Sequence, residues 1–197
     1  MEILKYIIIC AGGYLLGSVS VSIILSRLLG TDVRKKGSGN AGATNMARSY
    51  GLVAGFATLA GDFLKAIVVM ELARLLAGDW GLMAGGIACI TGHCFPVFYD
   101  YRGGKGISVG AAIGLAIDWR VFVGIIAVFL IAALISKKAS LGSVCASVAI
   151  IVFSAVFAVS MPRLLLAVYA AALALWQHRE NIRRLINGTE PDFRAAK

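Results

Sequence analysis

The sequence predicts an all-α membrane protein, a polytopic bundle of about seven transmembrane helices. Two observations lead to this fold class. Hydrophobic residues make up 59% of the chain, and the mean hydropathy is +0.86, far above the values of soluble domains. Apolar stretches also recur along its whole length. A hydrocarbon core about 30 Å thick needs roughly 20 apolar residues per crossing, and backbone in lipid must satisfy its own hydrogen bonds. These stretches are therefore expected to be helices.

The candidate spans follow one another with short connections. They are Ile3–Leu29, Leu52–Leu76, Gly81–Phe98, Ile107–Ile117, Val121–Ile135, Leu141–Val159 and Leu164–Trp176. The first is longer than a signal-peptide core and lacks a clear Ala-x-Ala cleavage pattern, so a retained helix is expected. The fourth is short for a crossing. To cross, it would have to lie in locally thinned bilayer, be tilted, or extend back through a snorkelling Lys105. A re-entrant fourth segment would leave six crossings.

Charge in the connections predicts the orientation. The elaborate loops of residues 30–50, 99–106 and 136–140 and the tail after residue 177 carry most of the lysines and arginines, whereas the other connections are minimal. The positive-inside rule then places the amino terminus outside and the carboxyl terminus in the cytoplasm of a bacterial inner membrane. The net charge of +9 does not require a nucleic-acid partner, because basic cytoplasmic loops are expected in a membrane protein. We find no linker or repeat, and expect one domain over residues 1–197.

Metal and disulfide chemistry are not expected. Cys10, Cys89, Cys94 and Cys145 occur singly in apolar segments, without a metal-ligand spacing. His93 and His178 are the only histidines, too few for a histidine-rich zinc site. No metal or cofactor is therefore predicted.

A polar, glycine-broken loop interrupts the oily sequence at residues 37–45, flanked by Lys35, Lys36 and Arg48. Glycine permits positive φ, so successive N–H groups can point into one concavity and hold an anion. The candidate phosphate-binding residues are Gly37, Ser38, Gly39, Asn40, Gly42, Thr44, Asn45 and Arg48. A flexible turn between helices is the alternative.

A second basic loop follows at Gly103, Gly104, Lys105 and Gly106. It is not a Walker A loop, because the preceding glycine and the final Ser or Thr are missing. Lys105 is flanked by glycines on both sides, so the backbone could close around an anion that its ammonium meets. The topology puts this loop on the same membrane face as residues 37–45.

The same face also receives the end of the last span. Residues 179–188 are predicted to be helical and to continue that span into water, with His178 and Asn181 on one face. Ser140 and Ser143 open the sixth span, where they either cap the helix or offer its N-terminus to an anion.

Charged residues inside the spans suggest supporting roles. Asp62 and Lys65 lie one turn apart in the second span, where isolated charges are expensive, so an ion pair facing the bundle is expected. A direct substrate role is the alternative. His93 is expected to hold the turn after the third span, and Glu180 is a further possible supporting residue beside His178.

Together these residues resemble the bacterial PlsY family of acyl-phosphate:glycerol-3-phosphate acyltransferases. The resemblance covers nearly the whole chain, in several motifs in the same order. They are residues 37–45 with Arg48, Asp62-x-x-Lys65, Gly92-His93-x-Phe95-Pro96, the loop 103–106, Ser140-Leu-x-Ser143, and residues 178–182 leading through Arg184-Leu185 to Gly188-Thr189-Glu190. Cys94, Tyr99, Asp100 and Ser108 depart from the usual pattern.

The resemblance implies a reaction in which a fatty acyl phosphate acylates the 1-hydroxyl of sn-glycerol 3-phosphate, giving lysophosphatidic acid and phosphate. It also implies a soluble acyl-phosphate synthase upstream. We expect catalytic roles for His178, Asn181 and Lys105 in this reaction. Neither histidine begins the H-x-x-x-x-D pair of soluble-type acyltransferases, because Phe98 and Arg183 stand where the aspartate would be. Direct attack without an acyl-enzyme is therefore expected, with His178 or a substrate phosphate as the proton acceptor.

Two other classes of membrane protein fit the sequence less well. An anion transporter would suit the basic mouth and the intramembrane charges, but transporters of that kind are built from inverted repeats, and no internal symmetry is evident. A CDP-alcohol phosphotransferase needs an aspartate-rich metal motif, which the sequence lacks.

Overall fold

The computed structural model describes residues 2–193; Met1 and residues 194–197, the ends of the expected domain, lie outside the described residues. All regular structure in residues 2–193 is helical, which confirms the predicted all-α class. The helices are α1 (Glu2–Ser18), α2 (Val21–Leu28), α3 (Ala43–Tyr50), α4 (Leu52–Cys94), α5 (Ile107–Ile117), α6 (Trp119–Ser136), α7 (Ala139–Val156), α8 (Met161–Gln177) and α9 (Arg179–Ile186), with 3₁₀ turns at Val33–Lys35 and Val97–Tyr99.

The prediction of one continuous helix over Ile3–Leu29 is wrong, because α1 ends at Ser18 and α2 starts at Val21. The Ser20 hydroxyl caps α2 by accepting a hydrogen bond from the Ile23 N–H at 3.4 Å. A helix end leaves carbonyl groups without partners. Here the Lys65 ammonium donates to the carbonyl oxygens of Gly17 (3.1 Å) and Val19 (2.5 Å), so the break is satisfied inside the bundle.

Helix α4 contains both the second and the third predicted spans. It doubles back at Ala77 and Gly78, whose backbone angles are not helical, and Gly78 has a φ of 58° that favours glycine. The returning half ends at Cys94 instead of the expected Phe98.

Close contact between α1 and the returning half of α4 depends on glycine. A Cβ on Gly17 would lie 2.3 Å from the carbonyl oxygen of Cys89, and one on Gly92 would lie 2.2 Å from that of Tyr14. Small residues let helix backbones approach in lipid, where packing replaces the hydrophobic effect as the driving force. These glycines therefore fix the position of α1.

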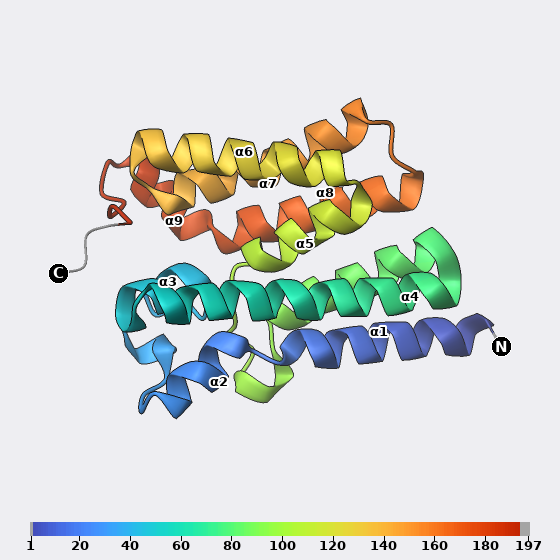
Figure 1. Cartoon of the computed structure of the whole chain (residues 1–197), viewed down its shortest axis with the longest axis horizontal. Helices are drawn as coiled ribbons and strands as arrows, with labels where there is room; N and C mark the ends of the chain where they lie inside the picture. Colours follow the sequence, from blue (N-terminus) through green and yellow to red (C-terminus); the bar gives the residue numbers. More distant parts are fainter. Residues whose placement is uncertain (1, 194–197) are drawn as a thin grey trace.

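The helices form two groups (Figure 1). Helices α1, α2 and α3 pack on α4, while α5, α6, α7 and α8 pack on one another, and α4 contacts both α5 and α8. The largest apolar core lies where the groups meet, around Met70, Leu82, Ile113 and Leu166. Helices α2, α3 and α9 lie together at one end of the molecule, opposite the start of α1.

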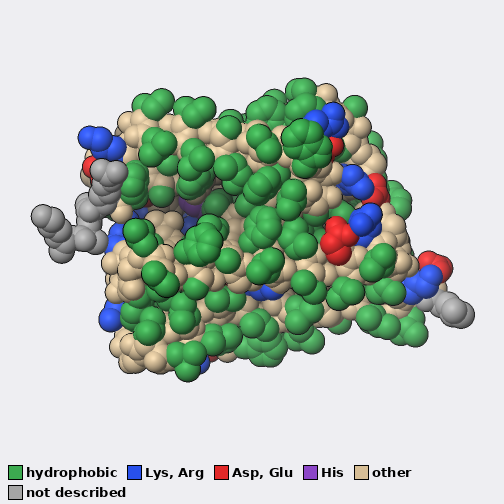
Figure 2. All heavy atoms as spheres, viewed as in Figure 1, with side chains coloured by type: hydrophobic (Ala, Val, Ile, Leu, Met, Phe, Trp, Pro, Cys, Tyr) green, Lys and Arg blue, Asp and Glu red, His purple; other side chains and the backbone are tan. Residues whose placement is uncertain are grey.

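The surface matches a protein embedded in lipid. Figure 2 shows apolar side chains over the middle of the molecule and charged side chains gathered toward its two ends. Four helical segments of residues 2–193 are long and apolar enough to cross a membrane: Glu2–Leu28, Leu52–Tyr99, Trp119–Ser136 and Ala139–Val156. Helices α5 and α8 are shorter apolar helices.

Two expectations about helix ends are corrected. Helix α9 does not continue α8, because His178 interrupts the helix between them. Ser140 is not the N-cap of α7: that position belongs to Lys138, and Ser140 lies in the first turn.

Candidate active site

A cavity of about 460 Å³ is lined by residues of both helix groups, including residues of α3 and α9. Its polar side chains come from widely separated segments: Ser38, Asn40, Thr44, Asn45, Arg48, His93, Lys105, Ser108, Ser140, Ser143, Ser147, His178, Asn181, Arg184 and Glu190. The rest of its lining is mostly apolar, including Leu59, Ile107, Ala111, Ile125, Ile126, Phe129, Leu130, Ala146, Ile150, Ala170, Ala171 and Ala174. The cavity is therefore suited to an amphiphile with a polar head and an apolar tail.

The three polar segments expected on one face meet in this cavity. The Lys105 ammonium donates a hydrogen bond to Oδ1 of Asn181, although 76 residues separate them. Ser38 and Arg48 line the same space. The structure thus brings together the residues that the sequence placed in separate loops.

Asn45 shapes the first loop from within. Its side chain is buried, its Oδ1 accepts from the Ser38 N–H at 3.0 Å, and its Nδ2 donates to the carbonyl oxygens of Val33, Lys36 and Asn40 at 3.2, 3.0 and 3.0 Å. These bonds occupy its amide. Asn45 therefore holds the loop's shape, and it also lines the cavity.

Helix α3 starts inside that loop, at Ala43, and was not anticipated. It places Thr44 and Arg48 one turn apart, and both line the cavity. The Nε of Arg48 is buried and has no hydrogen-bond partner among residues 2–193. An unsatisfied buried donor of this kind suits an anion.

Lys105 is carried by a loop fastened to the end of α4. The N–H groups of Gly103 and Gly104 donate to the carbonyl oxygens of Cys94 (3.2 Å) and His93 (3.0 Å). A Cβ on Gly104 would lie 2.2 Å from Nε2 of His93. Burial, with the nearby positive charge of Arg184, lowers the pKa of Lys105. A bound anion would offset both effects.

His178 sits in the interruption between α8 and α9, with 4% of its surface exposed. Its Nδ1 lies 2.8 Å from the carbonyl oxygen of Ala174. A carbonyl only accepts, so Nδ1 carries the proton and Nε2 is left with a lone pair. Burial lowers the pKa of His178 to about 4, so the imidazole is neutral at pH 7.

Glu190 is a site residue that the predicted set lacked. Its carboxylate accepts from Asn181 Nδ2 and from Arg184 Nε, both at 2.7 Å. Burial opposes its ionisation, but its polar neighbours Ser140, Asn181 and Arg184 outweigh burial and lower the pKa of Glu190. The sequence feature that could have identified Glu190 is the Gly188-Thr189-Glu190 motif. That motif does not indicate which residues Glu190 contacts.

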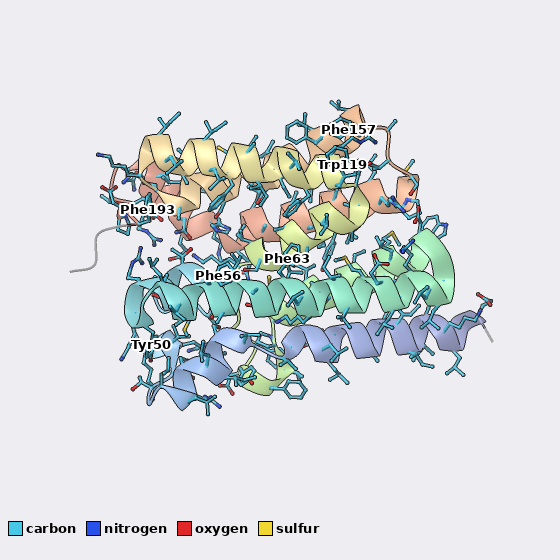
Figure 3. The ribbon with its side chains drawn as sticks, in the orientation of Figure 1. Tyr50, Phe56, Phe63, Trp119, Phe157 and Phe193 are labelled. Carbon is cyan, nitrogen blue, oxygen red and sulfur yellow. The ribbon has the colours of Figure 1, made fainter. Side chains whose placement is uncertain are left out.

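The segment after α9 folds back over the polar end of the cavity. Lys138 donates to the carbonyl oxygen of Glu190 and forms an ion pair with Asp192 at 3.2 Å, and the Phe193 N–H donates to the Lys137 carbonyl at 2.9 Å. Figure 3 shows Phe193 at this end of the molecule. These contacts hold Glu190 against Asn181.

Some predicted site residues lie outside the cavity wall. Among the described residues, Gly37, Gly39, Asp62, Lys65, Gly103, Gly104 and Glu180 do not line it. Glu180 is exposed, and the four glycines shape the two loops instead of contacting the space.

The predicted pair of Asp62 and Lys65 is confirmed, with 2.7 Å between carboxylate and ammonium. The His93 Nδ1 lies 3.7 Å from Asp62 and 3.5 Å from Lys65. His93 also lines the cavity and anchors the loop of Lys105. The Asp62–Lys65 pair therefore lies next to His93, whose carbonyl holds the loop of Lys105.

A second, more open hollow of about 690 Å³ adjoins the cavity. Four of its lining residues also line the cavity: Ser38, Arg48, Arg184 and Pro191. The other three belong to this hollow and not to the cavity: Lys36, Gly37 and Ser49. Within residues 2–193, no three His, Cys, Asp or Glu side chains gather as a metal site would require.

The chain is similar to proteins of known activity. The sequence profile described as glycerol-3-phosphate acyltransferase matches residues 7–188. A glycerol-3-phosphate acyltransferase of Rubrobacter xylanophilus is 43% identical over 92% of both chains. One of Clostridioides difficile is 40% identical over 96% of both.

Two solved structures are similar to the whole fold. The crystal structure of PlsY (YgiH), an integral membrane glycerol 3-phosphate acyltransferase, in its glycerol 3-phosphate form has a TM-score of 0.91 and 33% identity. The lysophosphatidic acid form has a TM-score of 0.89 at the same identity. Each match covers 95% of this chain and 94% of the other.

Proposed function

This chain belongs to the PlsY family of glycerol-3-phosphate acyltransferases, and we propose that its acyl donor is a fatty acyl phosphate. The acyl group passes to the 1-hydroxyl of sn-glycerol 3-phosphate, which yields lysophosphatidic acid and inorganic phosphate. This reaction is the first acylation of phospholipid synthesis, and a soluble acyl-phosphate synthase supplies the donor.

The observation that carries the proposal is the two-part cavity. Its polar end offers the cations Arg48, Lys105 and Arg184, enough positive charge for the phosphates of two substrates. Its remaining wall is apolar, as an acyl chain needs. An acyl phosphate is already activated, so the enzyme chiefly has to position two anions and stabilise developing charge.

The proposed mechanism is direct attack in a ternary complex. The loop of residues 38–45 and Lys105 hold the acyl-phosphate head and stabilise the departing phosphate. Arg48 and Ser143 bind phosphate, while His178 and Asn181 orient the glycerol hydroxyl. Asn181 suits this role because Lys105 and Glu190 fix its amide from both sides.

The proton acceptor is a phosphate oxygen of the substrate, which takes the single proton of the attacking hydroxyl, and His178 helps to orient the glycerol. A substrate phosphate suits this role because burial lowers the pKa of His178 to about 4, which weakens its imidazole as a base near pH 7. A phosphate group, whose second pKa is about 6, is closer to the working pH.

We further propose a single domain of seven crossings, counting the two halves of α4 separately. The amino terminus is outside, and the cavity opens near the cytoplasmic face of the bacterial inner membrane. The basic residues of both hollows support this orientation through the positive-inside rule. Leu59 and Leu130 are 40% and 48% exposed beside the cavity, which gives an amphiphile a path from lipid.

The test is phosphate release by the purified, detergent-solubilised protein given palmitoyl phosphate, with and without glycerol 3-phosphate. The proposal expects release that requires glycerol 3-phosphate and equals lysophosphatidic acid formation. Transfer from acyl-CoA or acyl carrier protein thioesters but not from palmitoyl phosphate would refute the donor. If turnover survives His178→Gln nearly intact, His178 is excluded as the base.

A further inference from the structure

Small side chains line the cavity next to its polar end. On α8 they are Ala170, Ala171 and Ala174, and on α7 they are Ala146 and Ser147. None of them reaches far from its helix, so a channel remains between the helices that a linear hydrocarbon chain can enter. The polar groups at one end fix the head of any amphiphile bound there.

The opposite end of this channel is a wall of large side chains. Ile125 on α6 and Ile150 on α7 each line the cavity about three turns, or roughly 16 Å, from the polar end of the helix. They are 4% and 3% exposed. Behind them the core is closed by Val121 and Leu166, which are fully buried.

The wall is held in place from neighbouring helices. A Cβ on Gly114 of α5 would lie 2.5 Å from Cδ1 of Ile125, so the isoleucine fills the space that this glycine leaves. On the side facing α4, the rings of Phe63 and Phe122 meet with their centroids 5.9 Å apart. Figure 3 shows Phe63 between α4 and the upper group of helices.

We infer that Ile125 and Ile150 are the stop against which the terminal methyl group of the acyl chain rests, and that they set the acyl-chain length. The inference rests on the proposed function, because it takes the occupant of the apolar channel to be the acyl chain. The basic residues fix one end of the donor and the isoleucines meet the other. The distance between the basic residues and the isoleucines thus limits the length of the acyl chain that fits.

A stop of this kind discriminates through packing. One methylene more or less in an apolar pocket changes kcat/KM by roughly 10- to 200-fold. A chain that is too long must distort the wall, and one that is too short leaves a void. A smaller residue at the wall should therefore favour longer chains, and a larger one should favour shorter chains.

The experiment compares Ile150→Ala and Ile150→Phe with the unaltered protein, using lauroyl, myristoyl, palmitoyl and stearoyl phosphates as donors. Ile150→Ala is expected to raise the kcat/KM ratio of longer to shorter donors about tenfold, and Ile150→Phe to lower it by a similar factor. Val152→Ala is the matched control, because Val152 lies on the same helix but is 52% exposed on the outer surface. It should leave the ratio unchanged.

General destabilisation slows all donors together, so only a shift in the ratio supports the stop. Ile125→Ala gives an independent second variant if Ile150→Phe fails to fold. An unchanged ratio in every folded Ile125 and Ile150 variant overturns the inference.

Failure of the proposed donor is distinguishable from failure of the stop. Thermal stabilisation by lysophosphatidic acids with the same four acyl chains requires no donor. The unaltered protein should prefer one length, and Ile150→Ala should move that preference toward longer chains. Equal stabilisation by all four lipids in both proteins also overturns the inference.

Discussion

The Lys65 ammonium lies 2.5 Å from the carbonyl oxygen of Val19, in the break between helices α1 and α2. The same ammonium is 2.7 Å from the Asp62 carboxylate and 3.5 Å from the His93 imidazole. His93 in turn anchors the loop that carries Lys105. A single, partly buried cation therefore joins the broken first helix to the basic loop of the site.

Lys65→Met should destabilise the protein by about 3–5 kcal/mol, because it leaves the Asp62 carboxylate buried without its partner. Thermal unfolding in detergent would measure the loss. The double variant Asp62→Asn/Lys65→Met removes both charges and should recover part of that stability. Glu71→Gln, in the exposed i,i+3 pair of the same helix, should change stability little. Equal effects at both pairs would contradict the prediction.

Gly104→Ala should impair the site through the loop of Lys105. The added methyl would lie 2.2 Å from the buried His93 ring, so the loop must move. A displacement near 1 Å can lower kcat/KM by about 100-fold. Gly12→Ala is the control, since a Cβ there meets nothing within 4 Å. Near-normal kcat/KM in Gly104→Ala would show that the loop tolerates the shift.

Asn181→Asp should lower kcat/KM by about 10- to 100-fold, because aspartate cannot donate to Glu190 and two carboxylates would then face each other. The double variant Asn181→Asp/Glu190→Gln restores a donor between the two positions. It should recover activity relative to Asn181→Asp alone. Identical losses in both variants would mean that this hydrogen bond does not matter for turnover.

His178 should contribute to acid sensitivity. Its pKa is about 4 in the folded protein and 6.5 as the ordinary value, because burial disfavours the imidazolium. Between these pH values the unfolded chain binds more protons, so stability falls as the pH falls. The shift corresponds to about 3 kcal/mol lost between pH 6.5 and pH 4.

The measurement is the unfolding free energy of the unaltered protein and of His178→Gln from pH 4 to pH 8. The difference between them should be constant above pH 6.5 and should move in favour of the variant as the pH falls below it. A difference independent of pH throughout would mean that His178 titrates alike in the folded and unfolded states.

The helical class and the order of the apolar segments could be predicted because lipid constrains composition and length. The break after Ser18 could not, because hydropathy stays high across it and its stabilising partner, Lys65, lies in another helix. Helix α3 could not be predicted because its residues are mostly polar and give no apolar pattern. Its position depends on packing against α4, where Ala47 contacts Gly55.

The candidate site also has parts that could be predicted from the sequence and parts that could not. Lys105, Arg48, His178 and Asn181 could be predicted to meet, because residue type and topology place them at one end of the bundle. The bonds that Glu190 makes could not, because they depend on how the chain after α9 folds back. The hydrogen bonds of the Asn45 amide inside its own loop could not be predicted either, because they depend on how that loop folds.

The two hollows that share Arg48 and Ser38 have a kinetic consequence. Under the proposed reaction, one substrate dissolves in the bilayer and the other in water, and they meet where the hollows join. Turnover should then depend on the mole fraction of donor among the surrounding lipids. Diluting a fixed amount of donor with inert phospholipid would slow the reaction, while its saturation by glycerol 3-phosphate would still follow the bulk aqueous concentration. Rates from different detergents or vesicles become comparable only on a scale of surface dilution.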